Sequence, residues 1–450
     1  MPTELDCFIS EARALRGSFF DRGRPITVAR APGWLDLLGG AAAYGGALAL
    51  GWPLGGGSFL ALQPAPEPLL RLRDEAGQHL SIPLEALCHP DGSPREYAAA
   101  AADLAPLPEY ARLAAAAWLA LMREEFVRFP GGAAALIDIA DGPGWSSGLV
   151  AAIAQALVSA YGVHLSPREL GLSCQVGAAR VAGPEHDPGT LGALVSVCAP
   201  GGALLQLHQQ PAWLWGNLHL PAHTALWALR VGDGPTTDVT LTHTAGAMAY
   251  RMAADAEDLP PHEADARWLG YLSNIGVARF AGRLGPLLPE VLAGQEFLAR
   301  YGPLPGVTID PEQLYPLRAA AALPIEEHLR ARTAAALLRA AANKAQRDED
   351  LTIVGELLAS SHWAQRAAGL GDLHADQLAQ QIDAAGPEAG LFGARMPAPA
   401  TRATLVVLGR VDAEPALRAI AERYAADCGL PVTIFGGSSS GCSPAGTREA

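Results

Sequence analysis

The sequence predicts a two-domain protein that combines an α/β domain with an α+β domain. Its 450 residues exceed the roughly 100–200 residues of a typical single domain. Short β-rich runs alternate with runs of helical periodicity along the chain, and the C-terminal part contains a strand, a helix and a strand in succession. We expect the boundary between residues 222 and 223, which gives domains of residues 1–222 and 223–450.

The N-terminal half contains an alanine-rich helical region followed by a buried strand. Leu113, Ala117 and Leu121 lie four residues apart, as on one face of a helix. The run from Ala133 to Ala140 is short and apolar, which favours a buried strand. The predicted strands of this half are residues 24–28, 133–140 and 203–208, and the predicted helices are residues 97–129, 149–161 and 167–181.

The C-terminal half has longer helical patterns. Its predicted strands are residues 224–231, 404–408 and 432–435, and its predicted helices are residues 263–280, 325–341, 351–368 and 414–428. The proline-rich tracts at residues 64–68 and 397–399 are expected to be loops.

The composition excludes several classes of protein. Half of the residues are apolar and the formal net charge is −14, with Lys344 as the single lysine. So acidic a chain, without a basic run, is unsuited to nucleic acid or anionic membranes. The sequence has neither a secretory signal nor an apolar run of membrane-spanning length, so we expect a cytoplasmic protein. Its six scattered cysteines favour reduced thiols without a bound metal.

One segment has the pattern of an anion site. The predicted strand 133–140 leads into Gly142-Pro-Gly-Trp-Ser-Ser-Gly148 and then into a helix. Gly142, Gly144 and Gly148 allow a tight turn and close approach of a ligand, and the free amides at a helix N-terminus attract phosphate. Ser146 and Ser147 are equally suited to a purely structural N-cap. Both interpretations, phosphate binding and a helix cap, stay open on spacing alone.

Several motifs together resemble the galactokinase and L-arabinokinase branch of the GHMP kinases. The first resembles "APGR(L/V)(D/N)xxGGxxDYxG", and the loop at 142–148 lies where the family has "GxGxSSSA". Others resemble "CGVMDQMTSACG…LLAMxCQPA", "RAAARHPIxE" and "GAKxTGGGxGG", in the same order as in the family. The matching segments are residues 31–46, 142–148, 174–212, 318–327, 355–371, 393–403 and 434–439.

The resemblance implies a GHMP kinase fold. Its N-terminal domain would be of the ribosomal-protein S5 domain 2 type, and its C-terminal domain would be ferredoxin-like. Family members transfer the γ-phosphate of ATP to a sugar hydroxyl with Mg²⁺, so ATP and Mg²⁺ are the expected cofactors if kinase activity survives. Carried over residue by residue, the resemblance assigns nucleotide binding to Gly142, Gly144, Ser146, Ser147 and Gly148, and sugar binding to Asp36, Gly40 and Tyr44.

The chain departs from the family at the positions that carry charge. Trp34 stands where the family has its arginine, Ala43 replaces a sugar-binding aspartate, and Gly192 replaces the catalytic aspartate. In the third glycine-rich motif, Pro397 and Pro399 remove amide donors. Phosphoryl transfer depends on positioned charges, so we expect no catalytic residue at the family positions and a pseudokinase that acts by binding a ligand or a protein.

An active sugar-1-kinase with a rebuilt site is the alternative. The acidic turn Glu185-His186-Asp187 lies in a stretch two residues longer than in the family pattern, so Asp187 could approach the position of the lost aspartate and His186 could act as a base. A solvated turn before Pro188 explains the same residues. His362 and Asp376 match family positions and are expected to be structural hydrogen-bonding groups. A sugar, a nucleotide and a protein all remain open as partners.

Overall fold

The computed structural model describes residues 3–183, 189–232, 238–342, 348–397 and 403–450. These residues form two compact units. Unit 1 comprises residues 1–35, 52–203 and 437–450, and unit 2 comprises residues 36–51 and 204–436. The chain passes between the units within β1 (Thr27–Leu38) and β2 (Leu48–Pro64). The predicted domain boundary after residue 222 stays a prediction. The two compact units meet in sequence after residue 203 instead.

Unit 1 is built on a mixed sheet with strand order β14-β1-β2-β5-β3-β4. The predicted strand at 133–140 is confirmed as β5 (Ala133–Asp138), which is antiparallel to β2 and parallel to β3. The predicted strand at 24–28 is wrong in extent, because β1 begins at Thr27 and continues through the first motif to Leu38. The remaining strands, which the sequence analysis did not predict, are β3 (Leu69–Arg73), β4 (His79–Pro83) and β14 (Arg448–Glu449).

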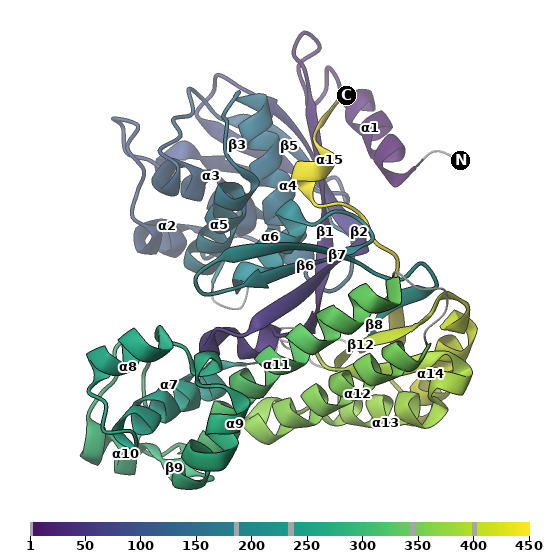
Figure 1. Ribbon diagram of the computed structural model, residues 1–450. Helices are drawn as coiled ribbons and strands as arrows, with labels where there is room; N and C mark the ends of the chain where they lie inside the picture. The colour runs from purple at the N-terminus through teal and green to yellow at the C-terminus, as the bar shows by residue number, and fades with distance from the viewer. Residues whose placement is uncertain (1–2, 184–188, 233–237, 343–347, 398–402) are drawn as a thin grey trace. The chain divides into compact units, whose positions relative to one another are not determined.

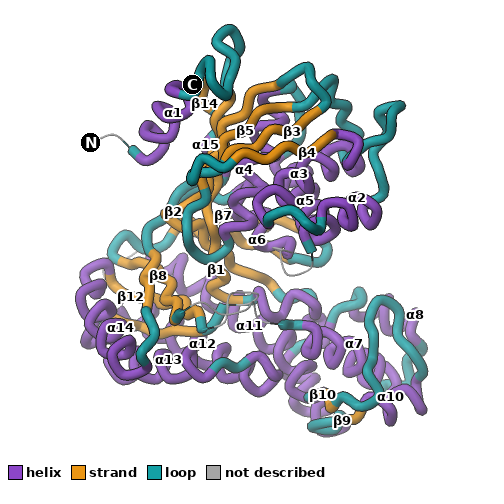
Figure 2. Tube along the Cα trace, turned by 180° about the vertical axis from the view of Figure 1, so that it is seen from behind, coloured by secondary structure: helices purple, strands orange, loops and turns teal. Residues whose placement is uncertain are grey.

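Helices cover both faces of this sheet (Figures 1 and 2). Because strand side chains alternate between faces, Leu60 and Leu62 pack into one cluster with the larger helices, and Phe59 and Ala61 pack into another with α1. The predicted helix at 97–129 is interrupted, because Pro106 and Pro108 lie between α2 and α3. The helices are α1 (Glu4–Ala14), α2 (Tyr97–Leu104), α3 (Glu109–Glu124), α4 (Trp145–Ala160), α5 (Pro167–Gly177), α6 (Gly189–Cys198) and α15 (Cys442–Ala445).

Unit 2 contains a four-stranded antiparallel sheet in the order β11-β12-β8-β13. The predictions at 224–231 and 432–435 are confirmed residue for residue as β8 (Thr224–Val231) and β13 (Val432–Phe435). The other two strands are β11 (Leu391–Arg395) and β12 (Thr404–Arg410). The long helices of this unit are α11 (Leu317–Ala342), α12 (Asp348–Gln365), α13 (Leu373–Ala385) and α14 (Glu414–Cys428).

The rest of unit 2 is a smaller helical cluster and a β-hairpin. The predicted strand 203–208 is confirmed as β6 (Ala203–His208), and it pairs with β7 (Trp213–His219), which the sequence analysis missed. The predicted helix 263–280 is interrupted: residues up to Trp268 are helical, but Leu269, Gly270 and Gly276 adopt positive φ and end the helical turns. The cluster comprises α7 (Thr240–Asp255), α8 (Pro261–Trp268), α9 (Val277–Arg279), α10 (Gly294–Tyr301) and the short pair β9 (Leu292–Ala293) and β10 (Leu314–Tyr315).

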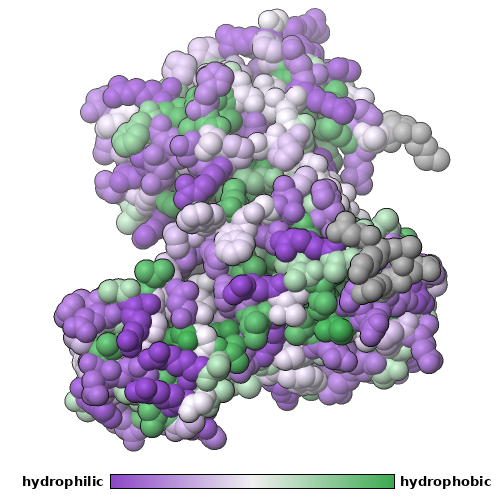
Figure 3. Space-filling view, in the orientation of Figure 1, coloured by the Kyte–Doolittle hydropathy of each residue, from purple (hydrophilic) through white to green (hydrophobic). Residues whose placement is uncertain are grey.

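The described helices include none that is long and apolar enough to cross a membrane. In the face of the molecule shown in Figure 3, hydrophilic residues predominate and hydrophobic residues are interspersed between them.

Candidate functional site

The segment predicted to bind phosphate forms a strand, a loop and a helix N-terminus, as expected. β5 ends at Asp138 and α4 begins at Trp145, with Gly144 in a left-handed conformation at φ 70° directly before the helix. A Cβ atom at Gly144 would lie 2.2 Å from Cδ1 of Trp34, so both the backbone conformation and the contact require glycine here. The loop is thus packed against Trp34.

Trp34 lies inside unit 1 rather than at its surface. Only 6% of the residue is exposed, and its Nε1 donates a buried hydrogen bond to Ser147 Oγ at 3.0 Å. Its backbone N–H donates to the carbonyl oxygen of Pro143 at 3.1 Å, which joins β1 to the loop. The indole therefore satisfies its single polar group and simultaneously engages a hydroxyl that the family resemblance assigns to nucleotide binding.

Gly192 completes this arrangement from α6. A Cβ atom at Gly192 would lie 2.4 Å from Cε2 and 2.5 Å from Nε1 of Trp34. Three segments far apart in sequence thus meet at one indole: β1, the loop before α4, and α6. We call the four residues Trp34, Gly144, Ser147 and Gly192 the Trp34 locus. The positions that the motif comparison had assigned to the arginine and the catalytic aspartate do come together in space.

The Trp34 locus does not fit Mg²⁺ or a phosphate. None of its four side chains is charged, and hard cations such as Mg²⁺ need carboxylate or phosphate oxygens. A phosphate is held by cations or free amides; the four side chains supply no cation, the Ser147 hydroxyl accepts from the indole, and the Gly148 N–H donates to Gly144 O at 3.2 Å. Within the described ranges, no group of three His, Cys, Asp or Glu side chains could hold a metal ion.

Asp36, one of the three residues predicted to bind a sugar, is fully buried in unit 2. Its Oδ2 lies 3.0 Å from Nη1 of Arg395, whose side chain is also fully buried. The same Nη1 donates to the carbonyl oxygens of Asp36 and Leu37. Burial raises the pKa of the Asp36 carboxyl, while Arg395 and the Gly40 N–H oppose that shift. Both Asp36 and Gly40 therefore take part in an internal ion-pair network.

Glu327 extends this network on α11. Its Oε1 accepts from the backbone N–H of Gly39 at 3.0 Å and from Ser361 Oγ at 2.8 Å, and lies 4.0 Å from Arg395 Nη2. Arg330 donates to the other carboxylate oxygen at 3.2 Å. The sequence analysis missed Arg395 and Glu327 as partners of Asp36. The only sequence signal was that Asp36, Glu327 and Arg395 lie in segments that resemble family motifs, and that two of them are acidic and one is basic.

Tyr44, the third predicted sugar ligand, also makes internal contacts. Its hydroxyl donates to the carbonyl oxygen of Ala320 at 2.6 Å, and its ring lies 4.9 Å from that of His243. A Cβ atom at Gly246 would lie 2.3 Å from the tyrosine ring, so that helix packs closely on it. Burial raises the pKa of the Tyr44 phenol, which stays neutral. Sugar binding by Asp36, Gly40 and Tyr44 remains a prediction.

His362 and Asp376 are hydrogen-bonded to one another, as expected for structural groups. His362 Nε2 lies 2.9 Å from Asp376 Oδ1, and its Nδ1 accepts from the Met396 N–H at 3.1 Å. This pairing assigns the ring proton to Nε2. Burial and the nearby Arg395 lower the pKa of His362 to about 4, so the ring is neutral. The candidates Glu185, His186 and Asp187 lie outside the described residues.

The sequence is similar to that of one curated protein. The chain is 28% identical to an L-arabinokinase of Arabidopsis thaliana over 504 residues, which covers 95% of this chain and 47% of that protein. It thus spans about half the length of this relative. No family model matches the chain.

Solved structures share the fold over the full length. Galactokinase of Lactococcus lactis, solved with galactose, has a TM-score of 0.68 at 16% identity and covers all of both chains. Mevalonate kinase of Methanococcus jannaschii has a TM-score of 0.54 at 11% identity and covers 93% of this chain and 99% of that one. Homoserine kinase of Cytophaga hutchinsonii has a TM-score of 0.52 at 11% identity, and the match covers 96% of this chain and 99% of that one. The chain therefore has the fold of galactokinase and mevalonate kinase, and its sequence is similar to that of an L-arabinokinase.

Proposed function

We propose that this chain is a pseudokinase, a sugar-kinase-like protein that no longer transfers phosphate and acts by binding a ligand or a protein. The observation that carries the proposal is the Trp34 indole, which fills the point where β1, the loop before α4, and α6 meet. Family members place an arginine and an aspartate at two of these positions. Here the same space holds an apolar ring and a glycine.

The expected free-energy costs favour complete loss of phosphoryl transfer over a merely slower reaction. Phosphoryl transfer depends almost entirely on positioning and on neutralising charge, and one missing group costs about 3 kcal/mol of barrier stabilisation. The Trp34 locus lacks both charged groups. A buried tryptophan contributes about 3–5 kcal/mol to stability, so the indole belongs to the core of unit 1. Selection for packing therefore accounts for these residues without selection for catalysis.

The alternative is an ATP-dependent sugar-1-kinase with a rebuilt active site. Its support is the similarity to L-arabinokinase and the retained Gly142, Gly144, Ser146 and Ser147 in the phosphate-loop position. In that case Mg²⁺-ATP would be the cofactor, and Glu185, His186 and Asp187 would be the catalytic candidates.

A coupled ADP-release assay across a panel of free sugars, including galactose and L-arabinose, distinguishes the two. We expect no turnover by the unaltered protein. A triple variant (Trp34→Arg, Ala43→Asp and Gly192→Asp) is the essential comparison, because catalytic groups act as a unit. The Gly192 change also needs the space that the indole occupies.

Turnover by the unaltered protein would overturn the pseudokinase proposal. If Asp187→Asn then abolished that turnover and His186→Ala shifted its pH profile, the rebuilt-site alternative would replace it. A variant at the exposed Asp412 provides a matched control for Asp187→Asn, because its carboxylate is a surface group.

A further inference from the structure

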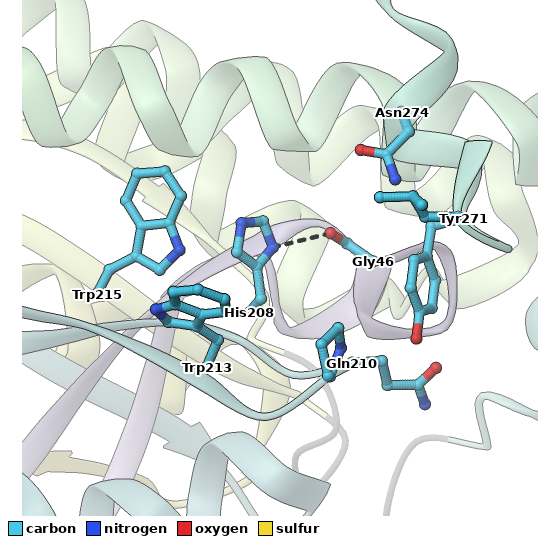
Figure 4. Close-up of a pocket in the computed structure, with 9 residues that line it drawn as sticks. Gly46, His208, Gln210, Trp213, Trp215, Tyr271 and Asn274 are labelled. Carbon is cyan, nitrogen blue, oxygen red and sulfur yellow. Dashed lines mark hydrogen bonds between the residues drawn. The ribbon is translucent and has the colours of Figure 1, made fainter. Parts of the chain in front are cut away.

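Unit 2 contains a cavity of about 630 Å³ that is lined by none of the predicted site residues that the structure describes. This volume falls within the range of about 300–1,000 Å³ typical of small-molecule sites. All of its lining residues belong to unit 2, and Figure 4 shows how they lie around it. They are Gly46, His208, Gln210, Pro211, Trp213, Trp215, Leu269, Tyr271 and Asn274.

Aromatic side chains stand on two sides of this cavity. Trp213 and Trp215 are two residues apart on β7 and therefore project from the same face of the strand. They are 66% and 56% exposed, although tryptophan is among the side chains that gain most from burial. Tyr271 and Asn274 lie opposite them, with His208 between (Figure 4). Each of these exposed indoles offers an apolar face on which a ligand can stack.

The polar groups of the cavity are neutral. His208 Nδ1 lies 3.1 Å from the carbonyl oxygen of Gly46, which can only accept, so Nδ1 carries the proton and Nε2 is an acceptor. Burial lowers the pKa of His208, which keeps the ring uncharged at neutral pH. Asn274 Nδ2 donates to Trp268 O at 2.8 Å, which fixes the amide and leaves its oxygen as an acceptor. Gln210 adds an amide donor and acceptor.

We propose that this cavity binds a neutral saccharide. A pyranose ring presents apolar C–H groups on its faces and hydroxyl groups around its edge, which matches indole faces surrounded by amide, phenol and imidazole groups. The nine described lining residues include no arginine, lysine or carboxylate, so this lining offers no charged side chain to neutralise a phosphate. A nucleotide or a sugar phosphate is therefore a poor ligand.

A ligand that contacts both indoles must extend along the strand, because residues i and i+2 of a strand are about 6.6–6.8 Å apart. A disaccharide meets this requirement better than a single sugar ring. This inference goes beyond the proposed function and does not depend on it, because saccharide binding here is compatible with the presence or the absence of phosphoryl transfer.

The test is a tryptophan-fluorescence and calorimetric titration with methyl pyranosides of galactose and L-arabinose, neutral disaccharides, galactose 1-phosphate and adenosine. We expect saturable binding of a neutral sugar, tighter for a disaccharide. We also expect a loss on the order of tenfold or more in Trp213→Ala and Trp215→Ala, because stacking on each ring is removed. Gln210→Leu should weaken binding while leaving the fold intact, since this side chain is exposed.

Trp363→Ala is the matched control, because Trp363 on α12 is also partly exposed and does not line the cavity. The proposal would be overturned by absence of binding across the sugars or by tighter binding of adenosine or the phosphate ester. It would also be overturned if Trp213→Ala and Trp215→Ala bound the sugar as tightly as the unaltered protein does. Sugar binding together with ADP release would support this site and contradict only the pseudokinase proposal, so the two can fail separately.

Discussion

The two units differ in whether they bury ionisable side chains. Among the described residues, the buried polar side chains of unit 1 are all uncharged: Ser58, Gln63, Ser147, Ser173 and Ser196. Those of unit 2 include six ionisable ones: Asp36, Glu327, Arg330, His362, Asp376 and Arg395. The contrast is informative because both sets include positions in family motifs.

The difference teaches that motif residues can be kept for packing alone. In unit 2, Asp36, Glu327 and Arg395 survive because each neutralises another inside the core. In unit 1, Trp34 and Gly192, which lie in segments that resemble family motifs, are uncharged and pack on each other. Under the pseudokinase proposal, charges with an internal partner are kept, whereas charges whose partner would be a phosphate are lost.

The largest expected effect is in unit 2. Replacing Arg395 with Met should destabilise the protein by about 3–5 kcal/mol, because Asp36 is left buried without its guanidinium partner. The free energy of unfolding from urea denaturation checks this. The control is Arg418→Met, which breaks a solvent-exposed pair with Glu414 and should cost about 0–1 kcal/mol. Equal effects of the two changes would show that the buried network does not stabilise unit 2.

A smaller effect is expected at the Trp34 locus. Gly192→Ala should cost about 1–3 kcal/mol, because the new methyl group would overlap the indole. The same change should cost much less in a Trp34→Ala background, which gives a double-mutant cycle with a clear coupling energy. Gly23→Ala, where nothing lies within 4 Å of the added atom, is the control in unit 1. Additive effects would mean that Trp34 and Gly192 do not pack together.

The third prediction is that the stability of the two units depends differently on pH. Burial lowers the pKa of His243, His328 and His362 from 6.5 to about 4, and all three lie in unit 2. As pH falls from about 6.5 to about 4, the unfolded chain binds protons that the folded unit excludes, so stability present above 6.5 is lost progressively. In unit 1, burial raises the pKa of the Cys174 and Cys198 thiols, the latter to about 12, so its stability falls above pH 9 instead.

Hydrogen exchange measured across pH can follow each unit separately. Protection of α11 and α12 should decline on acidification before that of α4 and β5. His262→Gln, at an exposed histidine, should leave the profile unchanged. Simultaneous loss of both units on acidification would contradict the contrast.

Much of the fold followed from local sequence signals, but the site did not. The strands 224–231 and 432–435 and the helix 414–428 agree with the structure because apolar periodicity and turn residues mark them locally. Strand β7 was missed because most of its residues, including both tryptophans, are exposed, so it lacks the pattern of a buried strand. The motif comparison identified Trp34 and Gly192 as replacements, but their mutual contact, like the pairing of Asp36 with Arg395, joins residues far apart in sequence and is visible only in three dimensions.

The most direct test of the central claim is calorimetric titration of the unaltered protein with Mg²⁺-ATP. If the Trp34 indole fills the phosphate-binding point, the titration should show no saturable heat at concentrations that saturate an active sugar kinase. The thermal unfolding temperature should likewise not rise with nucleotide, since a ligand at 100 times its Kd would add about 2.7 kcal/mol. A Kd in the low micromolar range would contradict the account, because it would require phosphate to bind where the indole is packed.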